Sequence, residues 1–225
     1  MSRIEELEKV MVHDGLSDLI FAEYKKALKR VRGNFLKLQH CYTTAIQFPA
    51  KRSEQAIRLI EFGLENYPDD WFSTYTSYLY IGIINERAGN YHEAYSAFFF
   101  AYNSLPTDKT DYINSISGKL MWMKLHIDGF QYSEEFEKYY SAFSKSDEFS
   151  KNILDNEFML SVGRMITCMK NNDLNGVKEA HDRAASLCQP GVVGRLQQIF
   201  DKHKYIDRLH ATPESVAFVK SVKLM

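Results

Sequence analysis

The amino-acid sequence predicts an all-α fold in which antiparallel helices come in pairs. Apolar residues recur at intervals of three and four along most of its 225 residues, a spacing that gives a helix one apolar face. Glycine (11 residues) and proline (5 residues) are scarce, which favours long helices over strands and tight turns. No segment alternates apolar and polar residues as a half-buried strand would.

Prolines, glycines and capping residues indicate where these helices begin and end. Pro68 ends one helix, because proline cannot continue the backbone hydrogen-bond ladder. Asp69 and Asp70 then stand where carboxylates can cap a long helix through residue 87. The other expected helices cover residues 4–11, 16–31, 35–48, 53–67, 91–105, 111–127, 133–143, 156–170, 174–187 and 192–202, and a last one begins at Thr212-Pro213-Glu214.

The composition is that of a soluble protein without a nucleic-acid partner. Hydrophobic residues make up 45% and charged residues 25% of the chain, and the net charge is -1, so there is no basic surplus to neutralise phosphates. The three cysteines, Cys41, Cys168 and Cys188, match no metal or redox motif and are expected to be reduced thiols. Neither a secretory leader nor a membrane span is visible, so we expect a cytoplasmic protein that does not insert into membranes.

A repeated pattern of residues relates successive helix pairs. Its best copy consists of Tyr78, Ile81, Gly82, Gly89, Tyr91, Ala94, Phe98, Ala101 and Pro106. Other copies contain Ala56, Ile60, Gly63 and Pro68 before it, then Tyr132, Tyr139 and Ala142, and finally Leu174, His181 and Ala184. The small residues at one position of this pattern (Gly63, Ala101, Ala142 and Ala184) predict a close crossing of neighbouring helices, with Phe98 and its equivalents filling the adjoining space.

This pattern resembles the tetratricopeptide repeat (TPR), from which Asn85 departs because the family prefers tyrosine there. The resemblance implies a right-handed superhelical array of antiparallel helix pairs, a TPR-like α-solenoid. About four such pairs would occupy residues 37–188 of a single domain, 1–225. Residues 1–36 would be N-terminal flanking helices and residues 189–225 C-terminal capping helices, whose outer faces must be polar.

In proteins of this family, the first helix of each pair lines a concave groove that binds peptides or partner helices. Carried over to this sequence, the groove would be lined by Thr76, Leu79, Ile83, Glu86, Arg87, Lys119, Met123 and His126, and further along by Ile166 and Met169. Methionine suits an adaptable binding surface, although methionine at helical spacing more often belongs to the core. The lysine and asparagine clamp of the chaperone-binding members is missing, since Cys41, Ala45, Leu79 and Ile83 occupy its positions.

A basic cluster lies near the N-terminus and consists of Lys25, Lys26, Lys29, Arg30 and Arg32. Such a cluster could meet an acidic partner or an anionic surface. A solvated helix face is the simpler interpretation, because the net charge of the chain is near zero.

Fragments of catalytic motifs are incomplete. His92-Glu93 begins like a zinc-protease helix, but Ser96 stands where the second histidine is required. The pairs His13-Asp14 and His181-Asp182 resemble those of helical metal phosphohydrolases, but no spacing supplies the remaining ligands. The sequence therefore predicts no catalytic residue, metal or cofactor.

The leading functional hypothesis is a non-enzymatic module that binds a partner protein or peptide as an adaptor, regulator or inhibitor. Two alternatives stay open, a metal-dependent hydrolase of the His-Asp type and a structural protein that associates with itself.

Overall fold

The computed structural model describes residues 2–146 and 154–188. They form ten α-helices and one short 3-10 helix, with no strand among them, so the predicted all-α fold is confirmed. The helices fall into two compact units, residues 1–109 and 110–225, which are treated separately below. The expected helices over 192–202 and from Thr212 lie outside the described residues.

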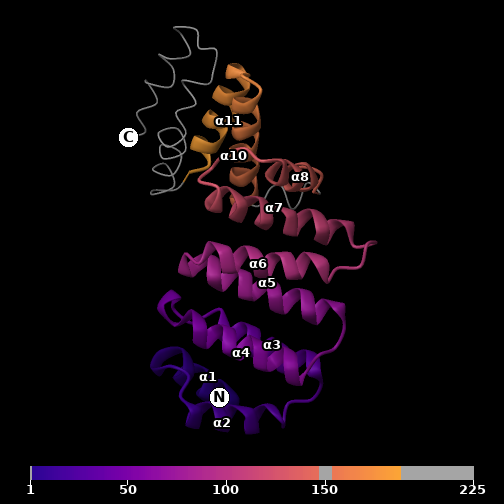
Figure 1. Ribbon diagram of the computed structural model, residues 1–225. Coiled ribbons are helices and arrows are strands. Elements are labelled where there is room, and N and C mark those ends of the chain that lie inside the picture. Colours follow the sequence, from indigo (N-terminus) through magenta and orange to yellow (C-terminus); the bar gives the residue numbers. More distant parts are fainter. Residues whose placement is uncertain (1, 147–153, 189–225) are drawn as a thin grey trace. The chain divides into compact units, whose positions relative to one another are not determined.

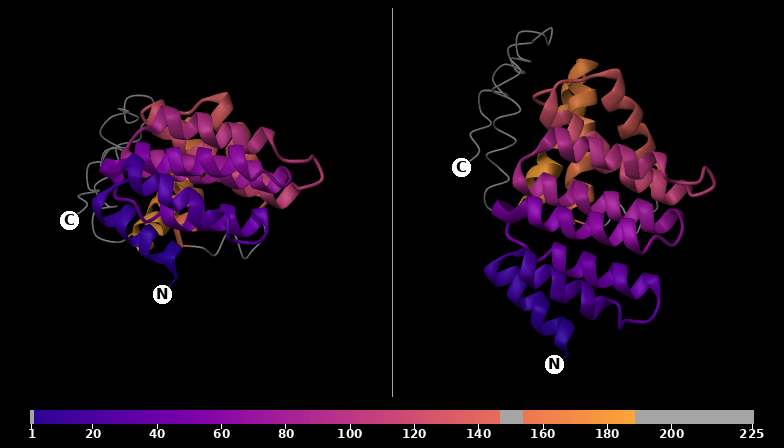
Figure 2. Two further views of the ribbon diagram at one scale, coloured as in Figure 1. Left: turned by 90° about the horizontal axis from the view of Figure 1, so that it is seen from below. Right: turned by 60° about the horizontal axis from the view of Figure 1, so that its bottom comes forward.

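The first unit contains three consecutive helix pairs (Figures 1 and 2). Its elements are α1 (Arg3–Asp14), α2 (Asp18–Leu28), α3 (Asn34–Ala45), η1 (Ala50–Arg52), α4 (Ser53–Asn66), α5 (Trp71–Ala88) and α6 (Tyr91–Asn103). The pairs are α1 with α2, α3 with α4, and α5 with α6. The first helices also lie side by side, α3 between α1 and α5, while α4 packs against α5 of the following pair.

The second unit contains two further pairs. Its elements are α7 (Thr110–Ile127), α8 (Glu134–Phe143), α10 (Leu154–Lys170) and α11 (Leu174–Ser186). Helix α7 pairs with α8 and α10 with α11, and α10 also contacts both helices of the preceding pair. Trp122 connects the two pairs, because its ring meets those of Phe130 at 6.1 Å and Phe158 at 5.9 Å.

Helix ends agree with the capping chemistry read from the sequence. The Asp70 carboxylate accepts hydrogen bonds from the backbone N–H groups of Phe72 (2.9 Å) and Ser73 (3.3 Å), two donors that a helix start leaves unpaired. Asp70 is therefore the cap of α5, whereas the neighbouring Asp69 uses only its backbone N–H, which donates to Ser73 Oγ at 3.2 Å. At the other end of α5, Gly89 adopts a left-handed conformation with φ of 81°.

The helices of a pair cross most closely at glycines. A Cβ atom on Gly82 of α5 would lie 2.3 Å from Cε1 of Phe98 in α6, and one on Gly118 of α7 would lie 2.7 Å from Cε2 of Phe143 in α8. Both phenylalanines are fully buried. The sequence pattern placed the close crossing at Ala101 and its equivalents, so the approach of Phe98 to Gly82 is a finding of the structure.

The second unit departs from the residue matching that the sequence suggested. That matching paired Phe98 with Tyr139, whereas the ring against Gly118 belongs to Phe143, one helical turn later. Ala142 is only partly buried, whereas Ala101 and Ala184 are fully buried.

Candidate binding surface

The candidate site is the exposed surface of α1, α3 and α5 in the first unit, called here the first-helix surface. Side chains on α3 that point away from its partner α4 recur at four-residue intervals, which places Phe35, Gln39 and Thr43 on one face. Phe35 and the adjacent Leu36 are large apolar side chains, each 52% exposed. Leu19 on α2 and Phe100 on α6 are more exposed still, so the α3 pair is singled out because Phe35 also lines a hollow.

A small hollow with a volume of about 30 Å³ lies between α3 and the start of α5. We call it the α3–α5 hollow, and its lining residues are Phe35, Leu38, Gln39, Tyr42, Asp69, Asp70, Phe72, Ser73 and Thr76. Its walls are aromatic and aliphatic, and its polar groups lie mainly at the α5 rim.

Hydrogen bonds and ring stacking fix the floor of this hollow. The Tyr42 hydroxyl donates to the backbone carbonyl of Ser73 (3.1 Å) and shares a hydrogen bond with Ser77 Oγ (2.8 Å). Its ring stacks on Tyr80 with centroids 5.1 Å apart. Burial raises the pKa of the Tyr42 phenol to about 12, although the bond to Ser77 acts in the opposite direction. A rigid floor lowers the ordering cost of binding.

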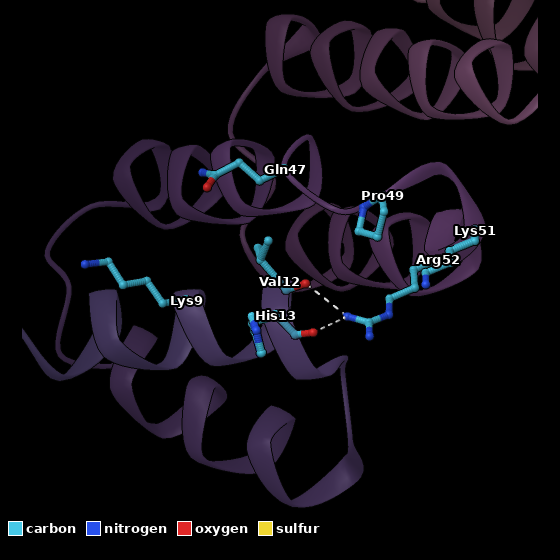
Figure 3. Close-up of a pocket in the computed structure, with 7 residues that line it drawn as sticks. All are labelled: Lys9, Val12, His13, Gln47, Pro49, Lys51 and Arg52. Carbon is cyan, nitrogen blue, oxygen red and sulfur yellow. Dashed lines mark hydrogen bonds between the residues drawn. The ribbon is translucent and has the colours of Figure 1, made fainter.

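A second hollow lies between the end of α1 and the end of α3, and Figure 3 shows its lining residues: Lys9, Val12, His13, Gln47, Pro49, Lys51 and Arg52. Arg52 is already engaged there, because its Nη1 donates to the backbone carbonyls of Val12 (3.0 Å) and His13 (2.9 Å). Lys9 and Lys51 lie on opposite sides of the view. The basic groups therefore do not converge on one point, so this hollow is a weaker candidate for a ligand.

The predicted groove residues of α5 have different environments. Thr76 lines the α3–α5 hollow, and Leu79, Ile83 and Glu86 are partly buried further along the helix. Arg87 has a structural role that the sequence did not reveal.

The Arg87 guanidinium donates to the backbone carbonyl of Ile46 at 2.7 Å and to that of Phe48 at 3.3 Å. These carbonyls follow the end of α3, where a helix leaves acceptors without partners. Arg87 is exposed and also ties α5 to these carbonyls, and its place in a groove stays a prediction.

The predicted groove residues of the second unit are mostly covered. Met123 and Ile166 are 0% exposed and Met169 is 3% exposed, so they offer no surface, and the expected methionine-rich lining is corrected. Lys119 and His126 are partly buried. The His126 ring packs edge-on against Trp122 at 5.1 Å and Phe130 at 4.9 Å, which gives it a packing role.

Sequence reasoning missed Phe35 and Leu36 as surface residues. The sequence gives no clear sign of their exposure, because consecutive apolar residues can also share a buried face, as Cys41 and Tyr42 of the same helix do.

Thiol and metal chemistry find little support in the described part of the chain. Burial raises the pKa of the Cys41 thiol to about 12, and burial also raises the pKa values of Cys168 and Cys188, so all three are protonated at neutral pH. Within residues 2–146 and 154–188, no three His, Cys, Asp or Glu side chains come together as metal ligands would. The His13–Asp14 and His181–Asp182 pairs are contacts between sequence neighbours, at 2.6 and 3.2 Å.

Comparison with known proteins gives no relative from which function could be carried over. No protein-family model, no curated protein and no solved structure matches the chain. Among the described helices, none combines the length and apolar content that a bilayer span requires.

Proposed function

We propose that this protein is a non-enzymatic interaction module of the TPR-like kind, which holds a segment of a partner protein on the first-helix surface. The observation that carries the proposal is the α3–α5 hollow, whose α3 wall includes Phe35. Phe35 and its sequence neighbour Leu36 are each 52% exposed. Exposed apolar groups next to a preformed hollow are typical of a site where another protein buries a side chain.

The helix pairs support the repeat part of the proposal. First helices lie next to one another in the first unit, as they do in the family that the sequence resembles, and Gly82 meets the Phe98 ring where α5 packs against α6. Asn85, the residue that departs from the family pattern, is buried at the turn, where its side-chain oxygen accepts a hydrogen bond from Asn90 Nδ2 at 3.4 Å. The right-handed superhelix belongs to the same proposal.

The test is capture of a partner from native cell extract, followed by measurement of binding with the purified partner. We compare wild type with Phe35→Ser and with the matched control Phe100→Ser on α6, where Phe100 is 57% exposed. Loss of one buried phenylalanine at an interface is expected to weaken binding about tenfold or more. Phe100→Ser should bind as wild type does.

The variant Thr76→Arg tests the same surface differently, because it places a long side chain at the hollow instead of removing the Phe35 ring from its wall. Thr76 is partly exposed on α5, so the long side chain can reach solvent without disturbing the core. The proposal expects it to block the partner as Phe35→Ser does. A partner that binds both variants like wild type contradicts the proposed surface.

A further inference from the structure

The segment from residue 25 to residue 37 concentrates positive charge beside the α3–α5 hollow. It contains Lys25, Lys26, Lys29, Arg30, Arg32 and Lys37 and no aspartate or glutamate. The chain as a whole balances 28 lysines and arginines against 29 acidic residues, so this local excess is not a consequence of overall composition.

Two of these cations pack against aromatic rings. Lys25 Nζ lies 4.1 Å from the ring centroid of Phe21 and 4.9 Å from that of Phe62, and Lys37 Nζ lies 4.7 Å from that of Tyr67. Such contacts attract a cation to the negative face of the ring and stabilise the helix surface. They account for Lys25 and Lys37 as structural residues.

The other four cations, called here the basic segment, are Lys26, Lys29, Arg30 and Arg32. All are exposed, and none forms an ion pair within the described part of the chain. Cations favour the negative end of a helix dipole, which explains Lys26 and Lys29 at the end of α2. Arg30 and Arg32 lie beyond Leu28, the last residue of α2, so the dipole explains them less well.

The basic segment leads directly into the hollow. Phe35, three residues after Arg32, is on its α3 wall, and the opposite rim carries Asp69 and Asp70. The Asp70 carboxylate is occupied by the first N–H groups of α5. A bound segment therefore meets positive charge on the α2–α3 side and negative charge on the α5 side.

The Asp69 and Asp70 carboxylates at the α5 rim would repel an extended anionic surface, such as a bilayer or a nucleic-acid backbone. A short protein segment can instead place its acidic residues on the basic segment alone, so a protein segment fits the arrangement better.

Building on the proposed function, we propose that the partner segment is acidic and carries one large apolar side chain. That side chain packs against Phe35 at the α3–α5 hollow, and aspartates or glutamates next to it lie on the basic segment. Electrostatic complementarity of this kind sets the orientation of the bound segment and raises the association rate more than it raises the affinity.

The experiment selects displayed random peptides on the full chain and measures the affinity of the enriched peptides by fluorescence polarisation. The charge variant is Arg30→Gln with Arg32→Gln, and its matched control is Lys51→Gln with Lys145→Gln, which removes the same charge elsewhere. We expect enriched peptides with acidic residues beside a large apolar residue. The charge variant should bind them about fivefold more weakly and with less dependence on salt, while the control binds as wild type does.

The possible failures are distinguishable. Suppose that the enriched peptides bind Phe35→Ser more weakly than wild type. If they carry no acidic residues, or bind the charge variant as tightly as wild type, the charge inference is overturned and the proposed surface stands. If no peptide is enriched, or if the enriched peptides bind Phe35→Ser as tightly as wild type, the proposed surface fails as well. If vesicles containing phosphatidylserine retain wild type but not the charge variant, the basic segment is a membrane contact and the inference is overturned.

Discussion

Replacement of Gly82 by alanine tests the close crossing of α5 and α6. A Cβ atom at this position would lie 2.3, 2.5 and 2.8 Å from three ring carbons of Phe98. Ordinary contacts between carbon atoms are about 3.5–4.0 Å, so the ring must move by about 1 Å. Phe98 is 0% exposed, which leaves it no open space to move into.

The expected loss of stability follows from two opposing effects. Overpacking of a core costs about 1–3 kcal/mol, and three contacts this short favour the upper end of that range. Alanine favours the helix over glycine by about 1 kcal/mol. The net destabilisation is therefore about 2 kcal/mol, or a fall in melting temperature of about 8 °C for a unit of this size.

Thermal and urea unfolding, followed by far-UV circular dichroism, measure this effect. The double variant Gly82→Ala with Phe98→Leu is the control, because a smaller side chain should make room for the methyl group and recover part of the loss. Equal or greater stability of Gly82→Ala alone would refute the assigned packing of this pair.

Three further predictions concern single side chains. Arg87→Ala should lower the free energy of unfolding by about 1–2 kcal/mol, because two carbonyls after the end of α3 lose a charged donor that water only partly replaces; unchanged stability in urea would contradict its structural role. Asp70→Ala should cost about 1 kcal/mol through loss of the α5 cap, whereas Asp69→Ala should be nearly neutral, and equal effects of the two in the same assay would exclude the assigned cap. The pKa of Cys41 rises from an ordinary value of 9.0 to about 12 on folding, so its thiol stabilises the fold below pH 9 and this contribution is lost as the pH rises toward 12; Cys41→Ala should show a flatter decline of melting temperature over that range than wild type.

Helix positions could be predicted because they depend on local chemistry. Pro68 and the Asp70 cap each act within a few residues, so the start of α5 could be read directly from the chain. The contact of Gly82 with Phe98 was not predicted, because the sequence pattern placed the close crossing at Ala101 and its equivalents.

Contacts between residues far apart in the sequence were harder to predict from the sequence. The turn between α7 and α8 is longer, so the ring that meets Gly118 moved one helical turn along the sequence, to Phe143. Arg87 reaches carbonyls about 40 residues earlier in the chain, and no local pattern predicts such a bond. Met123 was assigned to a surface from the repeat pattern alone, which cannot distinguish an exposed face from a covered one.

Hydrogen–deuterium exchange of the protein, alone and with its purified partner, tests the central claim most directly. Binding on the first-helix surface predicts slower exchange in residues 35–42 and 69–76, the segments of α3 and α5 that line the hollow. Protection confined to the second unit, with these two segments unchanged, would contradict the proposed binding surface.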